Sequence, residues 1–257
     1  MTTRPAFLDL RREPHAPGHA DGVLELFTAA RRLRSAMRDG FAGRALQGKN
    51  IAVLRQPSQL PVHLGQLRQA AQSLGARVAD VAFEPLGLPS EGRKADGEFD
   101  KGVDARRLGR MLGKFYDAVD CEVLAPEVVD AIEREANIMV FDGLCRPDHA
   151  ARAMADLLSI WQDRDNVRPL RCIAFFGAAD RAPRPAFLDA ARRLGFEIRL
   201  ASAEAVKAAS PDEVLIDTGT SADWDIRIGG NPVDPARRSE NHQLVIQAML
   251  LAGMTGH

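Results

Sequence analysis

Residues 112–161 read LGKFYDAVDCEVLAPEVVDAIEREANIMVFDGLCRPDHAARAMADLLSIW, and the order of apolar runs and polar turns predicts strand, helix, strand, helix. The compact apolar run at 117–124 predicts the first strand. Pro126 can take the first position of the next helix, where its missing N–H costs nothing, and Asn137 can end that helix. Residues 138–141 predict the second strand. This alternation is typical of an α/β fold.

The second helix of this stretch follows a tight turn. Asp142-Gly143 is a strong turn signal, and Asp148 can cap the helix. Apolar side chains then recur at i, i+3, i+4 and i+7, as on one helix face, and these are Met154, Leu157, Leu158 and Trp161. Open α/β sheets bind ligands where the loops after strands lead into helices. The first turn of this helix, with His149, is therefore a candidate ligand site.

Composition excludes several classes of protein. The chain has 257 residues, with 34 basic and 35 acidic side chains, and its net charge of −1 indicates no general attraction to nucleic acid or to membranes. No run approaches the roughly 20 apolar residues of a transmembrane helix, and residues 1–15 lack the apolar core of a signal peptide. Cys121, Cys145 and Cys172 lack metal-site spacing. We expect a cytoplasmic protein without metal or organic cofactor.

The sequence contains two similar strand–helix–strand units. Both place Ala-Ala-x-x-Leu-Gly before an alternating strand, at residues 70–75 and 190–195. The expected elements are a strand, helix and strand at 51–54, 62–74 and 76–83, and again at 172–176, 186–194 and 196–201. This layout predicts two Rossmann-like domains with parallel sheets, whose strand-end loops face a cleft.

The polar segment near residue 165 is the expected domain boundary. The first domain comprises residues 1–164, and the second comprises residues 165–238. A final helix at 239–253 is long enough to leave the second domain and to complete the first by packing on it.

The N-terminal region predicts a loop followed by an amphipathic helix. Residues 1–22 are rich in Pro, Gly and charge, and residues 23–37 have the apolar spacing of a helix. Four arginines of this helix are expected to form a solvated face, and they are Arg31, Arg32, Arg34 and Arg38.

The order of the predicted elements and several short stretches of sequence resemble those of the aspartate/ornithine transcarbamylase family. The stretches are QGKNI at 47–51, LGKFYDAV at 112–119, DGLCRPDHAARAMADLLSI at 142–160 and SENH at 239–242. The resemblance extends over most of the chain. It implies a first domain like the carbamoyl-phosphate-binding domain, a second like the amino-acid-binding domain, and a closing helix that returns to the first. It also implies a homotrimer with sites at the subunit interfaces.

The family's chemical motifs are mostly replaced in this sequence. The family has a Ser-Thr-Arg-Thr loop that binds carbamoyl phosphate, an Arg after the next strand, a His-Pro-x-Gln turn and an Arg in the closing helix. The aligned residues here are Ser58-Gln59-Leu60-Pro61, Glu122, His149-Ala150-Ala151-Arg152 and His242. In the second domain, the family's His-Cys-Leu-Pro aligns with Gly229-Gly230-Asn231-Pro232, and its Asn-containing loop with Ala178-Ala179-Asp180-Arg181.

These replacements lead to the first functional hypothesis. A charge-assisted Arg contact to phosphate contributes on the order of 1.5–3 kcal/mol, so losing three of them removes most of the affinity for the family's donor. Glu122 adds a negative charge beside the same site. The hypothesis is a transcarbamylase homologue that does not catalyse standard carbamoyl transfer. It acts as a binding, regulatory or assembly subunit, as a homotrimer or with an active transcarbamylase.

Two other hypotheses remain open. An active transferase can use a changed anionic donor or amine acceptor, and the residues able to hold a small anionic metabolite at a helix N-terminus are Arg55, Ser58, His149 and Arg152. The candidates of the second-domain cleft are Asp180, Arg181, Ser221 and Pro232. The third hypothesis is a nucleotide-binding module, and the lack of a glycine-rich phosphate motif after either opening strand argues against it.

Several of these residues also have a purely structural interpretation. His149 can simply start a helix, and Arg152 can be a surface arginine. Pro232 can keep the family's cis peptide for structural reasons alone. Asp117 and Asp156 are interpreted as residues that orient the local structure rather than take part in chemistry.

Overall fold

The computed structural model describes residues 19–40, 42–55, 64–82, 101–121, 124, 126–146, 149–164, 172–177, 185–201, 212–219 and 224–255. The chain divides into two compact units. We call Ser35–Arg146 with Leu250–His257 the four-stranded unit, and Thr3–Arg34 with Pro147–Met249 the five-stranded unit. The domain limits inferred from sequence, at residues 164 and 238, stay a prediction. In the described residues, none of the helices is long and apolar enough to cross a bilayer.

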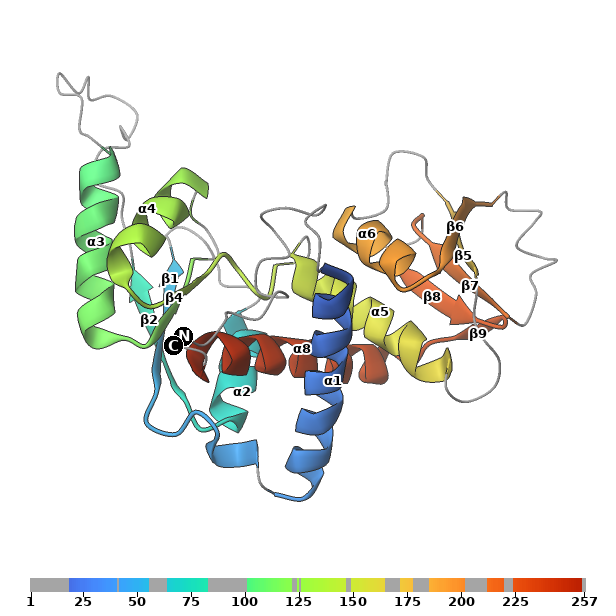
Figure 1. Ribbon diagram of the computed structural model, residues 1–257, viewed down its shortest axis with the longest axis horizontal. Helices are drawn as coiled ribbons and strands as arrows, with labels where there is room; N and C mark the ends of the chain where they lie inside the picture. The colour runs from blue at the N-terminus through green and yellow to red at the C-terminus, as the bar shows by residue number, and fades with distance from the viewer. Residues whose placement is uncertain are drawn as a thin grey trace. The chain divides into compact units, whose positions relative to one another are not determined.

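The four-stranded unit contains a parallel sheet with strand order β2-β1-β3-β4. Its strands are β1 Asn50–Arg55, β2 Arg77–Ala82, β3 Ala118–Asp120 and β4 Met139–Phe141, and its helices are η2 Ala42–Arg44, α2 Leu64–Ser73, α3 Lys101–Phe115 and α4 Pro126–Ala136 (Figure 1). β3 and β4 are buried along their whole length. Such burial is the pattern of parallel strands that are covered on both faces.

The predicted order of elements in residues 112–161 is confirmed. β3, α4 and β4 follow one another there, and α5 Ala150–Arg164 comes next. Pro126 begins α4, and Asn137 ends it with a left-handed φ of 52°. The buried carboxylate of Asp120 at the end of β3 accepts a hydrogen bond of 2.5 Å from the N–H of Gly143. This bond holds the turn that follows β4.

Helices α3 and α4 pack in direct backbone contact. A methyl group added at Gly113 would lie 2.0 Å from the carbonyl oxygen of Ala136, and one added at Gly109 would lie 2.8 Å from that of Ile132. Both distances are far shorter than van der Waals contact. The two glycines, one helical turn apart, therefore set how closely α3 approaches α4.

The last turn of α8 (Pro235–Thr255) packs on β4 in the four-stranded unit. A Cβ at Gly253 would come within 2.9 Å of the Met139 side chain and 3.0 Å of the Phe141 ring. This contact confirms the prediction that the C-terminal helix returns to the first sheet. The helix begins at Pro235 rather than at residue 239, because Asp234 caps it by accepting a hydrogen bond of 2.9 Å from the N–H of Ala236.

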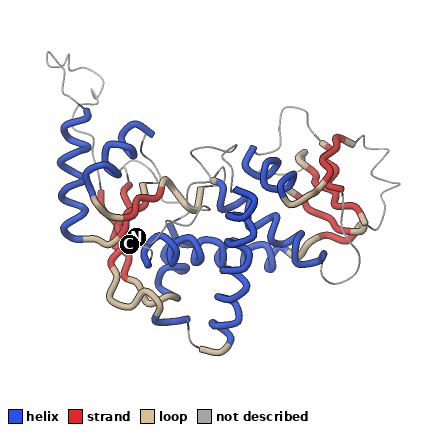
Figure 2. Tube along the Cα trace, in the orientation of Figure 1, coloured by secondary structure: helices blue, strands red, loops and turns tan. Residues whose placement is uncertain are grey.

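The five-stranded unit contains a mixed sheet with strand order β6-β5-β7-β8-β9. Its strands are β5 Cys172–Phe176, β6 Glu197–Leu200, β7 Glu213–Asp217, β8 Asp225–Ile228 and β9 Asn231–Pro232, and its described helices are α5, α6 Pro185–Arg193 and most of α1 His19–Arg38 and α8 (Figure 2). β5, β6 and β7 are parallel, as predicted, whereas β8 and β9 are antiparallel to their neighbours. Only residues 218–224 join β7 to β8, and a parallel crossover needs a dozen residues or more.

The turn between β8 and β9 is a two-residue hairpin loop. Gly229 and Gly230 both have positive φ, 56° and 83°, which is the conformation of a type I′ turn. The peptide bond before Pro232 is trans, so the family's cis peptide is not retained here.

Helix α1 also begins earlier than the sequence predicts, at His19 instead of residue 23. The apolar spacing from which this helix was predicted begins only at Val23, so it does not report the preceding turn.

A charged clamp joins the beginnings of β1 and β3. The Asp117 carboxylate accepts hydrogen bonds of 2.8 Å from the Lys49 ammonium and from the N–H of Asn50. Burial raises the pKa of Asp117, but these two hydrogen bonds and the charge of Lys49 outweigh burial and hold the pKa below its ordinary value of 3.8. Asp117 therefore orients local structure, as predicted.

We expect the substitution Gly113→Ala to lower the free energy of unfolding by about 1–3 kcal/mol, because its methyl group overlaps the backbone of α4. Urea denaturation of the full chain measures this change. Gly65→Ala in α2 is the control, since nothing lies within 4 Å of that position and its stability should be unchanged or slightly raised. Equal stabilities for the two variants would contradict the close packing of α3 on α4.

We expect Asp117→Asn to destabilise the chain at neutral pH and to matter less in acid. A carboxylate with a lowered pKa in the folded state contributes stability above its unfolded pKa and loses it as the pH falls through the folded pKa. The difference in unfolding free energy between wild type and variant should therefore shrink as the pH falls below 3.8. Denaturation curves over a pH series test this, and a constant difference would contradict the clamp.

Candidate functional site

His149 caps the helix on which the sequence-based site depends. Its side chain is buried, and its Nδ1 accepts a hydrogen bond of 3.0 Å from the N–H of Ala151 in the first turn of α5. An accepting Nδ1 carries no proton, so the neutral ring carries its proton on Nε2. His149 thus performs the structural role of a helix start. Asp148, the predicted cap, lies outside the described residues.

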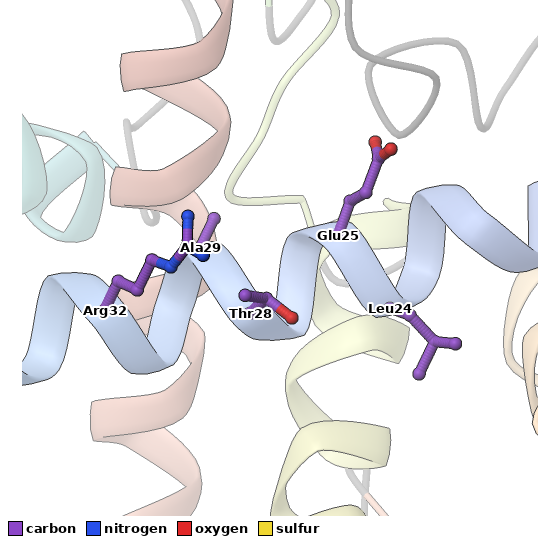
Figure 3. Close-up of a pocket in the computed structure, with 5 residues that line it drawn as sticks. All are labelled: Leu24, Glu25, Thr28, Ala29 and Arg32. Carbon is purple, nitrogen blue, oxygen red and sulfur yellow. The ribbon is translucent and has the colours of Figure 1, made fainter.

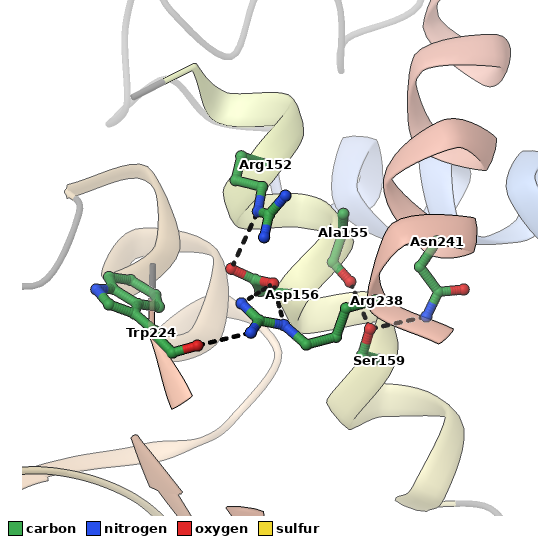
Figure 4. Close-up of polar contacts among 7 residues, drawn as sticks. All are labelled: Arg152, Ala155, Asp156, Ser159, Trp224, Arg238 and Asn241. Atoms are coloured by element: carbon green, nitrogen blue, oxygen red, sulfur yellow. Dashed lines mark hydrogen bonds and ion pairs between the residues drawn. The ribbon is translucent and has the colours of Figure 1, made fainter. Parts of the chain in front are cut away.

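A buried carboxylate on α5 is the centre of the polar structure in the five-stranded unit (Figure 4). Asp156 is 1% exposed, and its Oδ1 accepts two hydrogen bonds from Arg238 of α8, from Nε at 3.1 Å and from Nη2 at 2.9 Å. The third nitrogen of Arg238, Nη1, donates to the carbonyl oxygen of Trp224 at 2.6 Å. One guanidinium therefore links α5, α8 and the start of β8.

Arg152 faces the other oxygen of the same carboxylate. Its Nε lies 3.9 Å from Asp156 Oδ2, one helical turn along α5, and its side chain is 18% exposed. Arg152 and Arg238 together give Asp156 two positive neighbours. Arg152 is therefore a partly buried ion-pair partner and not a fully solvated surface arginine.

A second layer of hydrogen bonds continues along α5 and α8. The hydroxyl of Ser159 donates to the carbonyl of Ala155 at 2.9 Å and accepts from the Asn241 amide at 2.8 Å. The Asn241 carbonyl oxygen accepts in turn from Arg34 of α1. Each of these buried polar groups has a hydrogen-bonding neighbour, which is the condition for burying such groups without a large energetic cost.

Arg34 corrects one sequence-based prediction. Arg31, Arg32 and Arg38 are exposed on α1, as predicted, but the Arg34 side chain is only 20% exposed. Its Nε lies 3.2 Å from Glu240 on α8, in addition to its bond to Asn241. Helical periodicity cannot distinguish an arginine that faces water from one that faces a buried amide on another helix.

The structure describes only some of the residues predicted for the site. His149 lies immediately before α5 and Arg152 lies in its first turn, and Pro232 lies exposed on β9. Arg55 ends β1, without a described side chain. Four candidates lie outside the described residues, and they are Ser58, Asp180, Arg181 and Ser221. Glu122, which replaces the family's arginine after the strand, lies outside them too. His242, which replaces the family's closing arginine, is buried in α8.

The sequence analysis missed Arg238 and its partners. Asp156 was interpreted correctly as a structural residue, but the residue that neutralises it was not identified. A lone acidic residue on the apolar side of a helix is the signal that could have prompted a search for a basic partner, because buried charges are paired.

Cys172 lies beside charged side chains, and it does not resemble a nucleophile. Its Sγ lies 3.7 Å from the carboxylate of Glu213, which also accepts a hydrogen bond of 2.6 Å from Arg199 Nε. Burial and the negative charge of Glu213 raise the pKa of the Cys172 thiol. A thiol with a raised pKa stays protonated at neutral pH and is a poor nucleophile.

A surface hollow of about 550 Å³ lies along α1 (Figure 3). Its described lining comes from this one helix and consists of Leu24, Glu25, Thr28, Ala29 and Arg32. In the described part of the chain, no group of three or more His, Cys, Asp or Glu side chains could hold a metal ion. Of the candidate site residues that the structure describes, none lines the hollow.

Comparisons with known proteins agree with the resemblance in the sequence. No family model matches the chain. Ornithine carbamoyltransferase of Geobacter sulfurreducens is 25% identical over 176 residues, which are 68% of this chain and 54% of that protein. Ornithine carbamoyltransferase of Ignicoccus hospitalis is 27% identical over 171 residues, 65% of this chain and 50% of that protein. The chain thus matches about half the length of these curated relatives.

Solved structures show the same fold. Ornithine carbamoyltransferase from Thermus thermophilus has a TM-score of 0.63 at 16% identity, covering 99% of this chain and 100% of that one. Aspartate transcarbamoylase from Trypanosoma cruzi, in complex with carbamoyl aspartate and phosphate, has a TM-score of 0.59 at 12% identity, with the same coverage. The resemblance to the transcarbamylase family and the α/β fold class are both confirmed.

We expect His149→Ala to lower the free energy of unfolding by about 0.5–2 kcal/mol through loss of the helix cap. His149→Asn should recover most of this loss, because an Asn oxygen can accept the same hydrogen bond from the first turn of α5. Chemical denaturation of the two variants and the wild type makes the comparison. An Asn variant as unstable as the Ala variant would contradict the capping role.

Proposed function

We propose, from the premise that this chain is a relative of the ornithine and aspartate transcarbamylases, that it does not catalyse carbamoyl transfer from carbamoyl phosphate. It acts instead as a binding, regulatory or assembly subunit, either as a homotrimer or with an active transcarbamylase. The observation that carries the proposal is the ion pair between Arg152 and Asp156. Of the arginines predicted to bind an anion, Arg152 is the one whose side chain the structure describes, and it faces a buried carboxylate of its own helix.

The electrostatics of the first turn of α5 support this proposal. A dianionic donor needs cations whose charge is not already neutralised. Asp156 attracts Arg152 within 3.9 Å and would repel a phosphate group brought to the same guanidinium. The sequence offers Gln59, Leu60 and Pro61 where the family has Thr, Arg and Thr, so the phosphate loop does not supply the missing charge.

The role of His149 also supports the proposal. Its Nδ1 is occupied by the N–H of Ala151, and this bond explains why a histidine is compatible with this position without any ligand. A histidine at position 149, where the family also has one, is therefore not by itself a sign that the family's chemistry is retained. The same imidazole stabilises the helix.

A second candidate function is a transferase that uses a changed anionic donor or amine acceptor. It is favoured by the two hydrogen bonds through which Arg238 neutralises Asp156, since the Arg152 guanidinium is then not the only charge that compensates this carboxylate. The positive charge of Arg152, beside the α5 N-terminus, can therefore attract a smaller or less charged anion.

The test is a turnover assay of the full chain with carbamoyl phosphate and ornithine, and separately with aspartate. We expect no product above the background of the uncatalysed reaction, with an ornithine carbamoyltransferase as positive control. If the chain forms the homotrimer, sedimentation of the chain alone shows a species of three times the mass of one chain, whereas assembly with an active transcarbamylase gives a larger species only when the two proteins are mixed. Robust turnover with either amine would overturn the proposal.

A thermal-shift series separates the two candidates. The second candidate predicts that millimolar phosphate raises the melting temperature of the wild type and that Arg152→Gln abolishes the rise. Arg227→Gln is the control, because Arg227 is a half-exposed arginine of the same unit that pairs with Asp225. No shift in any protein is the result that the first proposal predicts.

A further inference from the structure

We infer that the outer surface of α3 is a docking site for an acidic, amphipathic segment of a partner protein. We define the α3 surface by Arg107, Met111, Lys114 and Phe115, which lie at i, i+4, i+7 and i+8 and so share one side of the helix. The helix lies at the left edge of Figure 1, in the four-stranded unit. The inference stands apart from the proposed function, because none of the candidate site residues belongs to this surface.

The α3 surface exposes two large apolar side chains in adjacent positions. Phe115 is 67% exposed and Met111 is 45% exposed. Leu24 and Leu200 are the other large apolar side chains that the structure describes as exposed, and each stands on a different element. Isolated exposed apolar residues are normal, whereas adjacent ones on one helix face favour an interaction surface. Met and Phe are also side chains typical of contact surfaces.

The same surface is strongly basic. α3 contains five basic residues and one acidic residue, in a chain whose net charge is −1. Arg107 and Lys114 flank the apolar pair and are exposed, and within the described residues neither has an ion-pair or hydrogen-bond partner. A segment that places two apolar side chains against Met111 and Phe115 would therefore gain most from carboxylates on either side.

The neighbouring helix favours a protein segment over a bilayer or a nucleic acid. α4 packs on α3 and exposes Glu127 and Asp130, and Arg110 of α3 pairs with Glu135 of α4 at 2.7 Å. A lipid surface or a nucleic acid backbone presents uniform negative charge and would be repelled by these carboxylates. An acidic peptide segment, by contrast, can place its carboxylates next to Arg107 and Lys114 and away from the carboxylates of α4.

The α3 surface is not needed for folding. The opposite side of α3 buries Ala105, Leu108 and Leu112 and approaches α4 through Gly109 and Gly113. Substitutions at Met111 and Phe115 replace mostly exposed side chains, so the variants should fold as the wild type does.

The probe is a synthetic helical peptide of about 15 residues with two leucines one turn apart and glutamates on either side of them. Fluorescence anisotropy measures its binding to the full chain. We expect a Kd of about 10–100 μM, typical of a small docking surface. The variants Met111→Ser/Phe115→Ser and Arg107→Glu/Lys114→Glu should each bind about tenfold more weakly.

Matched controls show whether the effect belongs to the α3 surface. Leu200→Ser removes an exposed apolar side chain, and Arg192→Glu reverses an exposed charge, both in the five-stranded unit, and neither should alter binding. Equal binding of a peptide with the same composition but its leucines on opposite faces would overturn the inference. So would tighter binding to phosphatidylserine vesicles or duplex DNA, lost in the α3 variants. Self-association that disappears in those variants would likewise overturn it, because a second copy would then occupy the surface.

Discussion

The buried carboxylate of Asp156 holds three elements of the five-stranded unit together through Arg238. A buried carboxylate without a counter-charge is strongly destabilising, and removing one partner of such a pair costs about 3–5 kcal/mol. Arg238 provides the counter-charge and also binds the carbonyl of Trp224. The start of β8, the middle of α5 and the start of α8 are thereby held together, and Ser159 and Asn241 continue the same contact between α5 and α8.

This constraint also determines what the start of α5 can do. In an anion-binding site, the cations of the first helical turn must be available to the ligand. Here Arg152 lies beside Asp156, and His149 uses its ring to cap the helix. Both side chains therefore make contacts that stabilise the unit itself. The fold does not depend on the family's substrate for these contacts. A scaffold stabilised from within is a suitable basis for a binding or assembly role.

The sequence predicts the local parts of the fold well. Both Ala-Ala-x-x-Leu-Gly segments end a helix in the same way, with Gly75 and Gly195 at φ of 88° and 82°, because a glycine after a helix has a strong local preference. The antiparallel direction of β8 was not predicted, since strand direction depends on pairing with a neighbouring strand and no local pattern reports it. The Arg238–Asp156 pair was missed because its members are 82 residues apart, and no local pattern connects them. Of the candidate site residues, the sequence placed His149 and Arg152 together at the start of α5, where the structure has them, and their role in binding stays a prediction.

The central claim is that the transcarbamylase scaffold is kept while the cations that bind its doubly charged donor are lost or engaged elsewhere. Isothermal titration calorimetry of the full chain with carbamoyl phosphate tests it most directly, with an ornithine carbamoyltransferase as the positive control. The account predicts no saturable heat up to about 10 mM ligand, which corresponds to a binding free energy weaker than about −3 kcal/mol. A saturable isotherm with a Kd in the micromolar range would contradict it.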